Sequence, residues 1–297
     1  MIFVRSYTKG YNILMFLLFD IGGTNTRLAI SDDGKTFSRP HIYKTPKDPE
    51  EGIRAIAEFA QGKGELKAAG GGIAGPVDWE KGMLVNSPHL AKWINFPFKD
   101  ELSDALGCPV YVANDTQIVG LGEAVHGAGR GNKTVVYMTI STGVGGARII
   151  DEEIDSTLQF SEIGHQIIAL SGIKDMNTQC PFCGGEGELE AVISGTAIEK
   201  RTGKKPYETH DQVFWEEVSG HTAIGVYNSI LYWSPDIVVL GGSMMKSPGI
   251  LLDKVQSVVA GMQNILPTTP AIVKAELKDI GGLYGAMTYI NYLHGKR

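Results

Sequence analysis

The sequence predicts an α/β protein built from two similar halves that face each other across a cleft. Two observations support this fold class. Two apolar strands joined by a turn rich in glycine and threonine occur twice along the chain, at residues 14–30 and 135–150. Strands also alternate with helices between and after these segments, as in sheets whose strands are mostly parallel. A duplicated fold of this kind would place both turns at one cleft.

The other elements follow from apolar periodicity and from the positions of glycine, proline and asparagine. The expected helices lie at residues 50–61, 99–106, from 116 onward, 191–201, 213–232 and 281–293. The expected strands lie at residues 68–73, 109–113 and 236–240. Between residue 150 and Glu190 the pattern fades, and we expect a loop-rich insertion there.

We expect three parts in the chain. Residues 1–12 form an N-terminal extension, residues 13–122 a smaller α/β domain, and residues 123–297 a larger one. The last helix is expected to pack back on the smaller domain. The boundary lies within residues 119–129, where glycines could give hinge freedom between the domains. These glycines are Gly120, Gly122, Gly127 and Gly129.

Composition excludes several classes of protein. The apolar fraction of 43% and the charged fraction of 20% are those of an ordinary globular chain. A net charge of −6 without a basic stripe argues against a nucleic-acid partner. The apolar run at residues 13–19 ends at Asp20 and is too short to span a bilayer, so no membrane partner is expected. Three cysteines, an odd number, favour a reducing compartment, and we expect a cytoplasmic protein.

The first glycine-rich turn follows a buried strand that ends at an acid. It comprises Asp20, Gly22, Gly23, Thr24 and Asn25. Successive backbone N–H groups in such a turn can bind phosphate oxygens. A plain β-hairpin with a glycine turn is the alternative.

The second turn shifts the balance between these alternatives. It contains Thr142, Gly143 and Gly145, so that hydroxyls again stand beside glycines. Two such turns in matching contexts would hold a polyphosphate from both halves of the fold, which favours a nucleotide site over two plain hairpins.

Asn114 and Asp115 stand at the end of an apolar strand, immediately before a helix. Strand ends of this kind face the ligand crevice in α/β sheets, and a carboxylate there can accept a hydroxyl proton during phosphoryl transfer. Helix capping is the alternative, since both residue types are favoured caps.

Further candidates lie in the second half of the chain. Glu162, His165 and Glu190 carry side chains that can bind sugar hydroxyls, or they are ordinary structural and surface groups. Gly241 and Gly242 follow the apolar residues 237–240 and would let an adenine ring lie close to the backbone. A simple turn after the strand explains these two glycines equally well.

Cys180 and Cys183 have the CxxC spacing of zinc knuckles. A structural Zn²⁺ needs four ligands, and His165 is the natural third, with Glu188 as a candidate fourth. The alternative is two reduced cysteines in a loop. Cys108 is interpreted as an ordinary buried cysteine.

In this order, the motifs of residues 16–293 resemble the ROK family of sugar kinases and sugar-responsive repressors, which share the actin-like, duplicated ribonuclease-H-type fold. The similar segments are DIGGTNTR (20–27), GGIAGPV (71–77), NSPHLAKW (86–93), VANDT (112–116), STGVGG (141–146), EIGH (162–165), CGGEGELE (183–190), LEAVISGTAI (189–198) and VVLGGSMM (238–245).

The resemblance implies an ATP- and Mg²⁺-dependent hexose kinase. Asp115 would be the base and Asn114 a neighbouring sugar ligand, while Asp20 would organise Mg²⁺ near the phosphates of ATP. The other implied sugar ligands are Glu162, His165, Glu190 and two residues of the sugar-side loops, Gly75 and Asn86. Glucose, phosphorylated at carbon 6, is the first candidate substrate, before fructose and the N-acetylhexosamines. A homodimer is the family expectation.

The sequence departs from the family pattern at two places. Pro181 and Glu188 stand where the family usually has cysteines, which alters the zinc segment, and His89 stands where asparagine is common. The alternative functions are a sugar-responsive repressor and a non-catalytic sugar-binding protein. A repressor carries a DNA-binding domain, and the residues before Asp20 show no helix-turn-helix pattern. We therefore expect the kinase.

Overall fold

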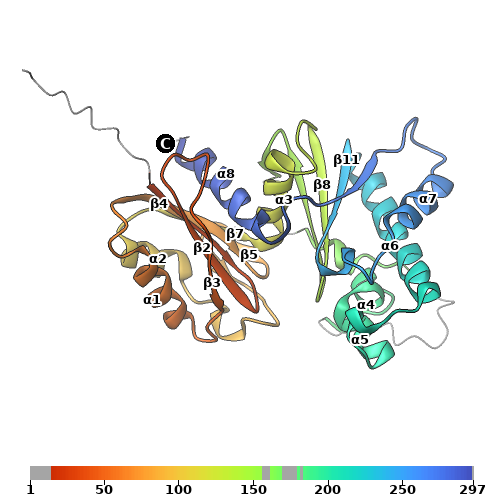
Figure 1. Ribbon diagram of the computed structural model, residues 1–297, viewed down its shortest axis with the longest axis horizontal. Helices are drawn as coiled ribbons and strands as arrows, with labels where there is room; N and C mark the ends of the chain where they lie inside the picture. The colour runs from red at the N-terminus through yellow and green to blue at the C-terminus, as the bar shows by residue number, and fades with distance from the viewer. Residues whose placement is uncertain (1–14, 156–160, 169–178, 181–182, 296–297) are drawn as a thin grey trace, which may run out of the picture.

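The computed structural model describes residues 15–155, 161–168, 179–180 and 183–295. The expected extension at residues 1–12 lies outside them. The described chain forms two lobes, each built on a five-stranded sheet (Figure 1). The predicted α/β fold class is confirmed.

The first sheet has the strand order β3-β2-β1-β4-β7. Its strands are β1 (Met15–Ile21), β2 (Asn25–Ser31), β3 (His41–Lys44), β4 (Leu66–Ile73) and β7 (Val110–Asn114). β1 pairs antiparallel with β2 and parallel with β4. Six of the seven residues of β1 are buried, because the sheet is covered on both faces. Helices α1 (Pro49–Ala60) and α2 (Phe98–Leu106) cover one face, and α8 (Gly281–Gly295) packs on the other.

The second sheet repeats this topology with the order β10-β9-β8-β11-β12. Its strands are β8 (Thr134–Ile140), β9 (Val144–Ile150), β10 (Glu153–Ile154), β11 (Ile237–Gly241) and β12 (Ala271–Lys274). β8 pairs antiparallel with β9 and parallel with β11, as β1 does with β2 and β4. The packed helices include α4 (Leu189–Ile193), α5 (Gly195–Thr202), α6 (Gln212–Trp233) and α7 (Leu252–Met262). Among the described helices, none combines the length and apolar composition needed to cross a bilayer.

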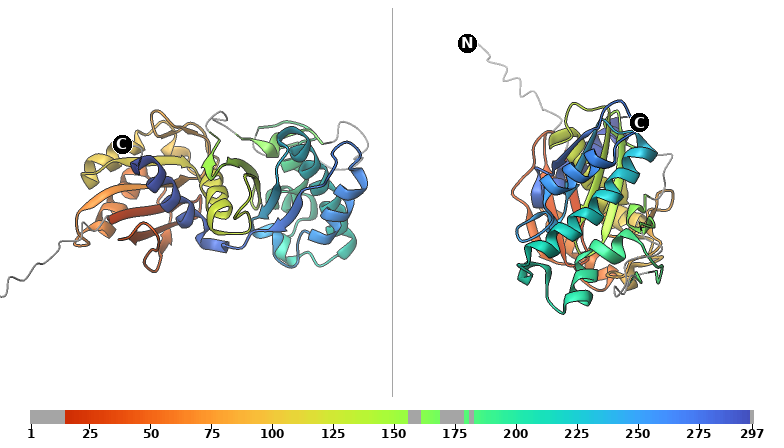
Figure 2. Two further views of the ribbon diagram at one scale, coloured as in Figure 1. Left: turned by 90° about the horizontal axis from the view of Figure 1, so that it is seen from above. Right: turned by 90° about the vertical axis from the view of Figure 1, so that its right-hand side faces the viewer.

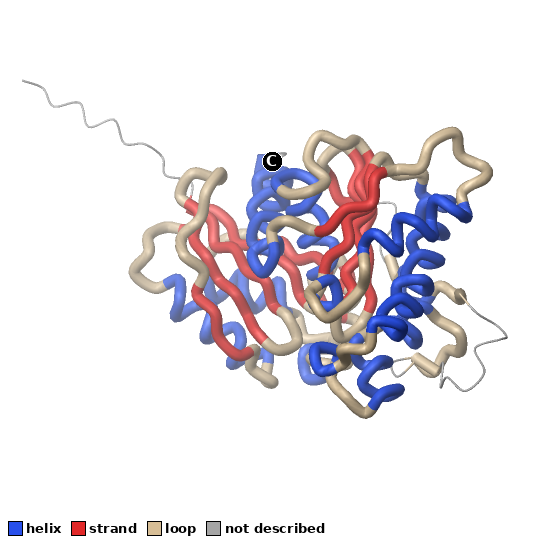
Figure 3. Tube along the Cα trace, turned by 45° about the vertical axis from the view of Figure 1, so that its right-hand side comes forward, coloured by secondary structure: helices blue, strands red, loops and turns tan. Residues whose placement is uncertain are grey.

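Helices α3 (Asp115–His126) and α8 lie between the two sheets (Figures 1 and 3). Figure 2 shows α8, in dark blue, lying over the first lobe although it ends the described chain. The two helices meet at glycines. A Cβ on Gly122 would lie 2.3 Å from the carbonyl oxygen of Gly281, and one on Gly285 would lie 1.7 Å from that of Ile118. The expectation that Gly120 and Gly122 give hinge freedom is therefore wrong, because both lie inside a packed helix.

The structure also differs from the expected elements elsewhere. The predicted helix at residues 191–201 is two helices, because Ser194 has an extended backbone and its side chain accepts from the N–H of Ala197 to cap α5. The strands β3 and β12, the helix α7 and the short hairpin of β5 (Val77–Asp78) and β6 (Met83–Leu84) were not predicted.

Candidate active site

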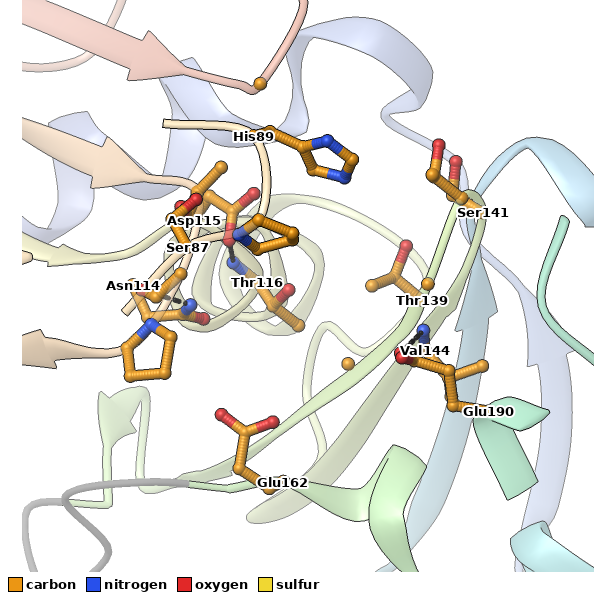
Figure 4. A pocket seen from close by; sticks show the side chains of 18 of the residues that line it. Ser87, His89, Asn114, Asp115, Thr116, Thr139, Ser141, Val144, Glu162 and Glu190 are labelled. Carbon is orange, nitrogen blue, oxygen red and sulfur yellow. Dashed lines mark hydrogen bonds between the residues drawn. The ribbon is translucent and has the colours of Figure 1, made fainter. Parts of the chain in front are cut away.

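A cleft of about 610 Å³ lies between the lobes. Both glycine-rich turns, the first turn of α3, the loop at residues 74–76 and residues 87–89 line it. Figure 4 shows Asp115, Glu162 and Glu190 on different walls of this cleft. The duplicated topology therefore brings the two predicted turns to one place.

The first turn connects β1 to β2. Gly22 N–H donates to the carbonyl oxygen of Asn25 at 3.0 Å, and Thr45 Oγ1 donates to the carbonyl oxygen of Gly22 at 2.7 Å. Gly23 and Thr24 line the cleft, whereas Gly22 and Asn25 do not. A Cβ on Gly23 would lie 2.6 Å from the Cβ of His89. Glycine at 23 thus allows the loop of residues 87–89 to approach the turn.

The second turn connects β8 to β9, and Thr142, Gly143 and Gly145 all line the cleft. Glu190 of α4 supports it, because Glu190 Oε2 accepts from the N–H of Val144 at 2.7 Å. A Cβ on Gly143 would lie 2.7 Å from the same oxygen. Through this one oxygen, Glu190 connects α4 to the second turn.

Asn114 caps α3. Its Oδ1 accepts from the N–H of Gln117 at 3.1 Å, and its Nδ2 donates to the carbonyl oxygen of Gly75 at 2.8 Å. Asn114 borders the cleft, but both ends of its amide have protein partners. The bond to Gln117 is the helix cap that was the alternative interpretation of Asn114. The bond from Nδ2 holds the loop at Gly75.

Asp115 is the first residue of α3, and its carboxylate lies in the cleft (Figure 4). Its Oδ1 accepts from the N–H of Thr116 at 2.8 Å. Burial, together with the negative charge of Asp20, raises the pKa of Asp115 to about 7. An acid with such a pKa can take up a proton near neutral pH.

Asp20 ends β1 and is buried beside the first turn of α8, where a Cβ on Gly282 would lie 2.7 Å from Asp20 Cγ. Arg27 donates to Asp20 Oδ2 at 3.3 Å. Burial raises the pKa of Asp20 even though Arg27 acts in the opposite direction. Asp20 is not among the residues that line the cleft.

Glu162 and His165 stand on the wall formed by the insertion. His165 Nε2 lies 3.8 Å from Glu162 Oε2, while His165 Nδ1 lies 2.7 Å from Glu188 Oε2. Burial lowers the pKa of His165, but the hydrogen bond to Glu188 and three nearby carboxylates outweigh it, so that the pKa is raised. Burial raises the pKa of Glu162. The His165 imidazole thus has Nε2 near Glu162 on the cleft wall and Nδ1 bonded to Glu188.

The predicted metal ligands, His165 among them, lie close together. Ligand atoms of His165, Cys180, Cys183 and Glu188 all lie within 4.8 Å of one another. Cys183 Sγ is 3.7 Å from His165 Nδ1 and 3.2 Å from Glu188 Oε1. One nitrogen, two sulfurs and one carboxylate oxygen are a donor set that tetrahedral Zn²⁺ accepts, so the residues fit the metal.

Asn86, Gly241 and Gly242 also lie outside the cleft lining, as do Asp20, Gly22 and Asn25. Protein atoms fill the space on the side of Gly241 and Gly242 where a Cβ would point. A Cβ on Gly242, whose φ is 93°, would lie 2.1 Å from the carbonyl oxygen of Ile140, and one on Gly241 would lie 2.3 Å from the Tyr137 hydroxyl. Ser243 follows them, and its Oγ lies 2.9 Å from Ser141 Oγ of the second turn.

Sequence reasoning missed several polar residues of the cleft, namely Ser87, Thr116, Gln117, Thr139, Ser161 and Thr196. Three of them, Ser87, Thr116 and Ser161, adjoin a predicted residue in the chain, which was the available signal. Thr196 donates to the carbonyl oxygen of Thr142 at 2.9 Å. Ser87 donates to the carbonyl oxygen of Ala74 at 2.9 Å.

In a comparison with known protein families, residues 17–292 match the model of the ROK family. Among curated relatives, a glucokinase of Thermotoga maritima is 29% identical over 91% of this chain and 95% of its own length. A fructokinase of Zymomonas mobilis is 33% identical over 77% of this chain and 80% of its own.

Solved structures show the same likeness. A ROK hexokinase from Thermus thermophilus is similar with a TM-score of 0.79 and 26% identity, over 95% of this chain and 99% of its own. A ROK family transcriptional regulator, a homologue of the E. coli MLC protein, has a TM-score of 0.81 at 19% identity, over 95% of this chain and 79% of its own. At that identity the regulator shows the fold alone.

Proposed function

The chain belongs to the ROK family, and from this membership and the cleft we propose that it is an ATP-dependent hexose kinase with Asp115 as the general base. One observation carries the proposal. A carboxylate with a pKa of about 7 stands at a helix N-terminus in one cleft with both glycine-rich turns. Relatives named glucokinase and fructokinase support a hexose as the acceptor.

In the proposed reaction, the attacking hydroxyl of the sugar lies against Asp115. Its proton moves to the Asp115 carboxylate as the oxygen bonds to the γ-phosphorus of ATP and the bond to ADP breaks. The backbone N–H groups of the turns at Gly23 and Gly143 stabilise charge on the phosphoryl oxygens. Closing the two lobes over the cleft would exclude water as a competing acceptor.

We place Mg²⁺ near Asp20. Asp20 is a buried carboxylate whose charge raises the pKa of Asp115, and Mg²⁺ favours sites with one or two carboxylates beside the substrate phosphates. When bound, the ion would neutralise phosphate charge. Asp20 would hold it, and the Arg27 guanidinium, 3.3 Å from Asp20 Oδ2, lowers the pKa of that carboxyl against the larger effect of burial.

Glu162 and His165 are proposed to bind hydroxyls of the sugar from the opposite wall. His165 Nε2 faces Glu162, and Nδ1 is already engaged by Glu188. We further propose that a structural Zn²⁺ held by His165, Cys180, Cys183 and Glu188 would fix the orientation of that imidazole. Glucose, phosphorylated at carbon 6, remains the first candidate acceptor.

An ADP-release assay over a sugar panel tests the proposal. Purified protein with ATP and Mg²⁺ is offered glucose, fructose, mannose and the N-acetylhexosamines, and the position of phosphate in any product is determined by NMR. We expect sugar-dependent ADP release with at least one hexose. No release with any sugar would refute the kinase function, and operator DNA binding would then be measured, since the fold is shared with a regulator.

A further inference from the structure

Gln117 borders the same cleft as Asp115, two residues further along α3. Its side chain is almost fully buried, with 3% exposure. Its Oε1 is enclosed and has no hydrogen-bond partner. Within the described part of the chain, no hydrogen bond engages the Nε2 end of the amide either. A buried amide at the wall of the cleft thus has both of its polar ends unused.

The usual local partner of such a side chain is not used. Gln117 is the third residue of α3, and glutamine at this position commonly reaches back to the backbone N–H of the helix cap. The cap here is Asn114, whose backbone belongs to β7 and is paired with Ile73 of β4. No hydrogen bond joins the Gln117 side chain to the backbone N–H of this cap, so the reciprocal capping bond is absent.

Buried polar side chains almost always have a partner, so each exception calls for an explanation. Ser161, whose Oγ is enclosed and also lacks a partner, lines the same cleft. Two unpaired polar groups thus occur on the walls of one cavity. A ligand with several hydroxyls would pair with both, because each hydroxyl donates one hydrogen bond and accepts others.

We propose that Gln117 is a specificity-determining residue whose amide hydrogen bonds to one hydroxyl of the acceptor sugar. This inference rests on the proposed kinase function. Asp115 is in contact with the attacking hydroxyl, and Gln117 lies on the same helical turn, so it binds a different hydroxyl of the same sugar. Rotation of the terminal amide, whose torsion is broad, can present either the donor or the acceptor to the cleft.

A cycle of variants and deoxy sugars tests this pairing. Gln117→Leu has a similar volume and no polar atoms. kcat/KM is measured for the wild type and the variant with the best hexose and with each of its monodeoxy analogues. We expect the variant to lose about tenfold or more in kcat/KM with the parent sugar, as for one hydrogen bond to a substrate. With one analogue, which lacks the paired hydroxyl, the two proteins should be equal.

Gln117→Glu and Gln263→Leu serve as comparisons. Glutamate keeps the shape and the acceptor, so it should rescue part of the loss if the sugar hydroxyl donates. Gln263 also has an enclosed amide nitrogen without a partner, but it does not line the cleft, and its loss should not distinguish between the analogues. Thermal unfolding without sugar identifies a structural effect, which would lower Tm in the absence of any ligand and lower kcat/KM by the same factor with every analogue.

The outcomes separate the inference from its premise. If the wild type phosphorylates no hexose, the kinase function fails and the inference fails with it. If the wild type is active but Gln117→Leu loses the same factor with every analogue, or loses nothing, then Gln117 binds no sugar hydroxyl while the kinase function stands.

Discussion

Gly72 of β4 and Asp115 of α3 are in direct contact, so closely that a Cβ on Gly72 would lie 2.6 Å from the Cα of Asp115. Backbone, and not a flexible side chain, occupies that space. Glycine at this position therefore sets how near the first turn of α3 comes to the sheet, and with it the position of the proposed base.

We expect Gly72→Ala to lower kcat about 100-fold, because a displacement of the order of an ångström is enough to misalign a reacting group. ADP release at saturating sugar measures kcat, and a fluorescent nucleotide measures ATP affinity, which should change little. Gly220→Ala is the matched control, since nothing lies within 4 Å of its added Cβ. Equal kcat for both variants would contradict this role of Gly72.

Replacing the proposed base gives the most direct kinetic test. Asp115→Asn keeps the shape of the side chain but cannot accept the proton, so kcat should fall about 10²–10⁴-fold. The nucleotide Kd should be retained, because Gly23 and Gly143 are untouched. Asp48→Asn, at the exposed cap of α1, controls for loss of a carboxylate. Turnover near the wild-type level in Asp115→Asn would remove Asp115 from the mechanism.

The raised pKa of Asp115 predicts a pH dependence. Its value of about 7 in the folded protein means that kcat/KM rises with pH and levels off above about 7–8, since the base must be ionised in the free enzyme. Stability follows the opposite trend. The ordinary pKa of this carboxyl is 3.8, so between these two values the folded state binds more protons at Asp115 than the unfolded state.

The contribution of Asp115 to stability therefore falls as pH rises from about 4 to about 7. Asp115→Asn should raise Tm at pH 8 by more than it does at pH 5, as expected where catalysis requires an unfavourable buried charge. Differential scanning calorimetry at both pH values checks this. An identical change in Tm at the two pH values would show that the carboxyl titrates as in water.

The sequence predicted the parts of the fold whose signal is local. β1, β8 and β11 are apolar runs because both faces of their sheets are covered, and the glycine-rich turns follow two of them. β3 gave no such signal, since its residues are mostly exposed at the sheet edge. The break at Ser194 depends on a cap that competes with a continuous apolar pattern.

Long-range relationships were the harder part of the site. The proximity of Asp20 to Asp115 follows from the parallel pairing of β1, β4 and β7, which strand-end reasoning can anticipate. The bond from Val144 to Glu190 could not be predicted, because it depends on how α4 packs beside the second turn. Gly241 and Gly242 would meet β8 atoms if they carried a Cβ, so the packing of β11 against β8 alone requires glycine there, and the adenine site stays a prediction.

The cluster of His165, Cys180, Cys183 and Glu188 predicts a bound metal that a chelator can remove. We expect one Zn²⁺ per chain by elemental analysis, and loss of Zn²⁺ together with a lower Tm after treatment with a chelator, since structural zinc contributes to folding. Because His165 Nε2 faces Glu162 and the cleft, metal loss should raise KM for the sugar more than the nucleotide Kd.

Cys183→Ser should reproduce the effects of chelation. Cys108→Ala is the control, because Cys108 is buried in the other lobe, in the core of the first sheet, and should leave the zinc content unchanged. Protein that contains no zinc when purified from zinc-supplemented cells, with a Tm that chelator does not change, would rule out the metal site.

We predict that the side chain of Glu123 holds the two lobes together. Its buried carboxylate accepts from the backbone N–H groups of Ala128, Glu276 and Leu277, at 3.0, 3.1 and 2.8 Å. The first follows α3, and the other two lie between β12 and α8. One side chain thus joins the two segments through which the chain passes between the lobes.

Glu123→Ala would leave three backbone N–H groups without their acceptor, at a cost of about 3 kcal/mol or more, because each unpaired buried donor costs about 1–3 kcal/mol. Glu123→Gln retains one acceptor oxygen and should lose less. Urea unfolding followed by circular dichroism measures both, with Glu58→Ala on the exposed face of α1 as the matched control. If Glu123→Ala unfolded at the same urea concentration as Glu58→Ala, the lobes would be held together by the α3–α8 contact and not by this carboxylate.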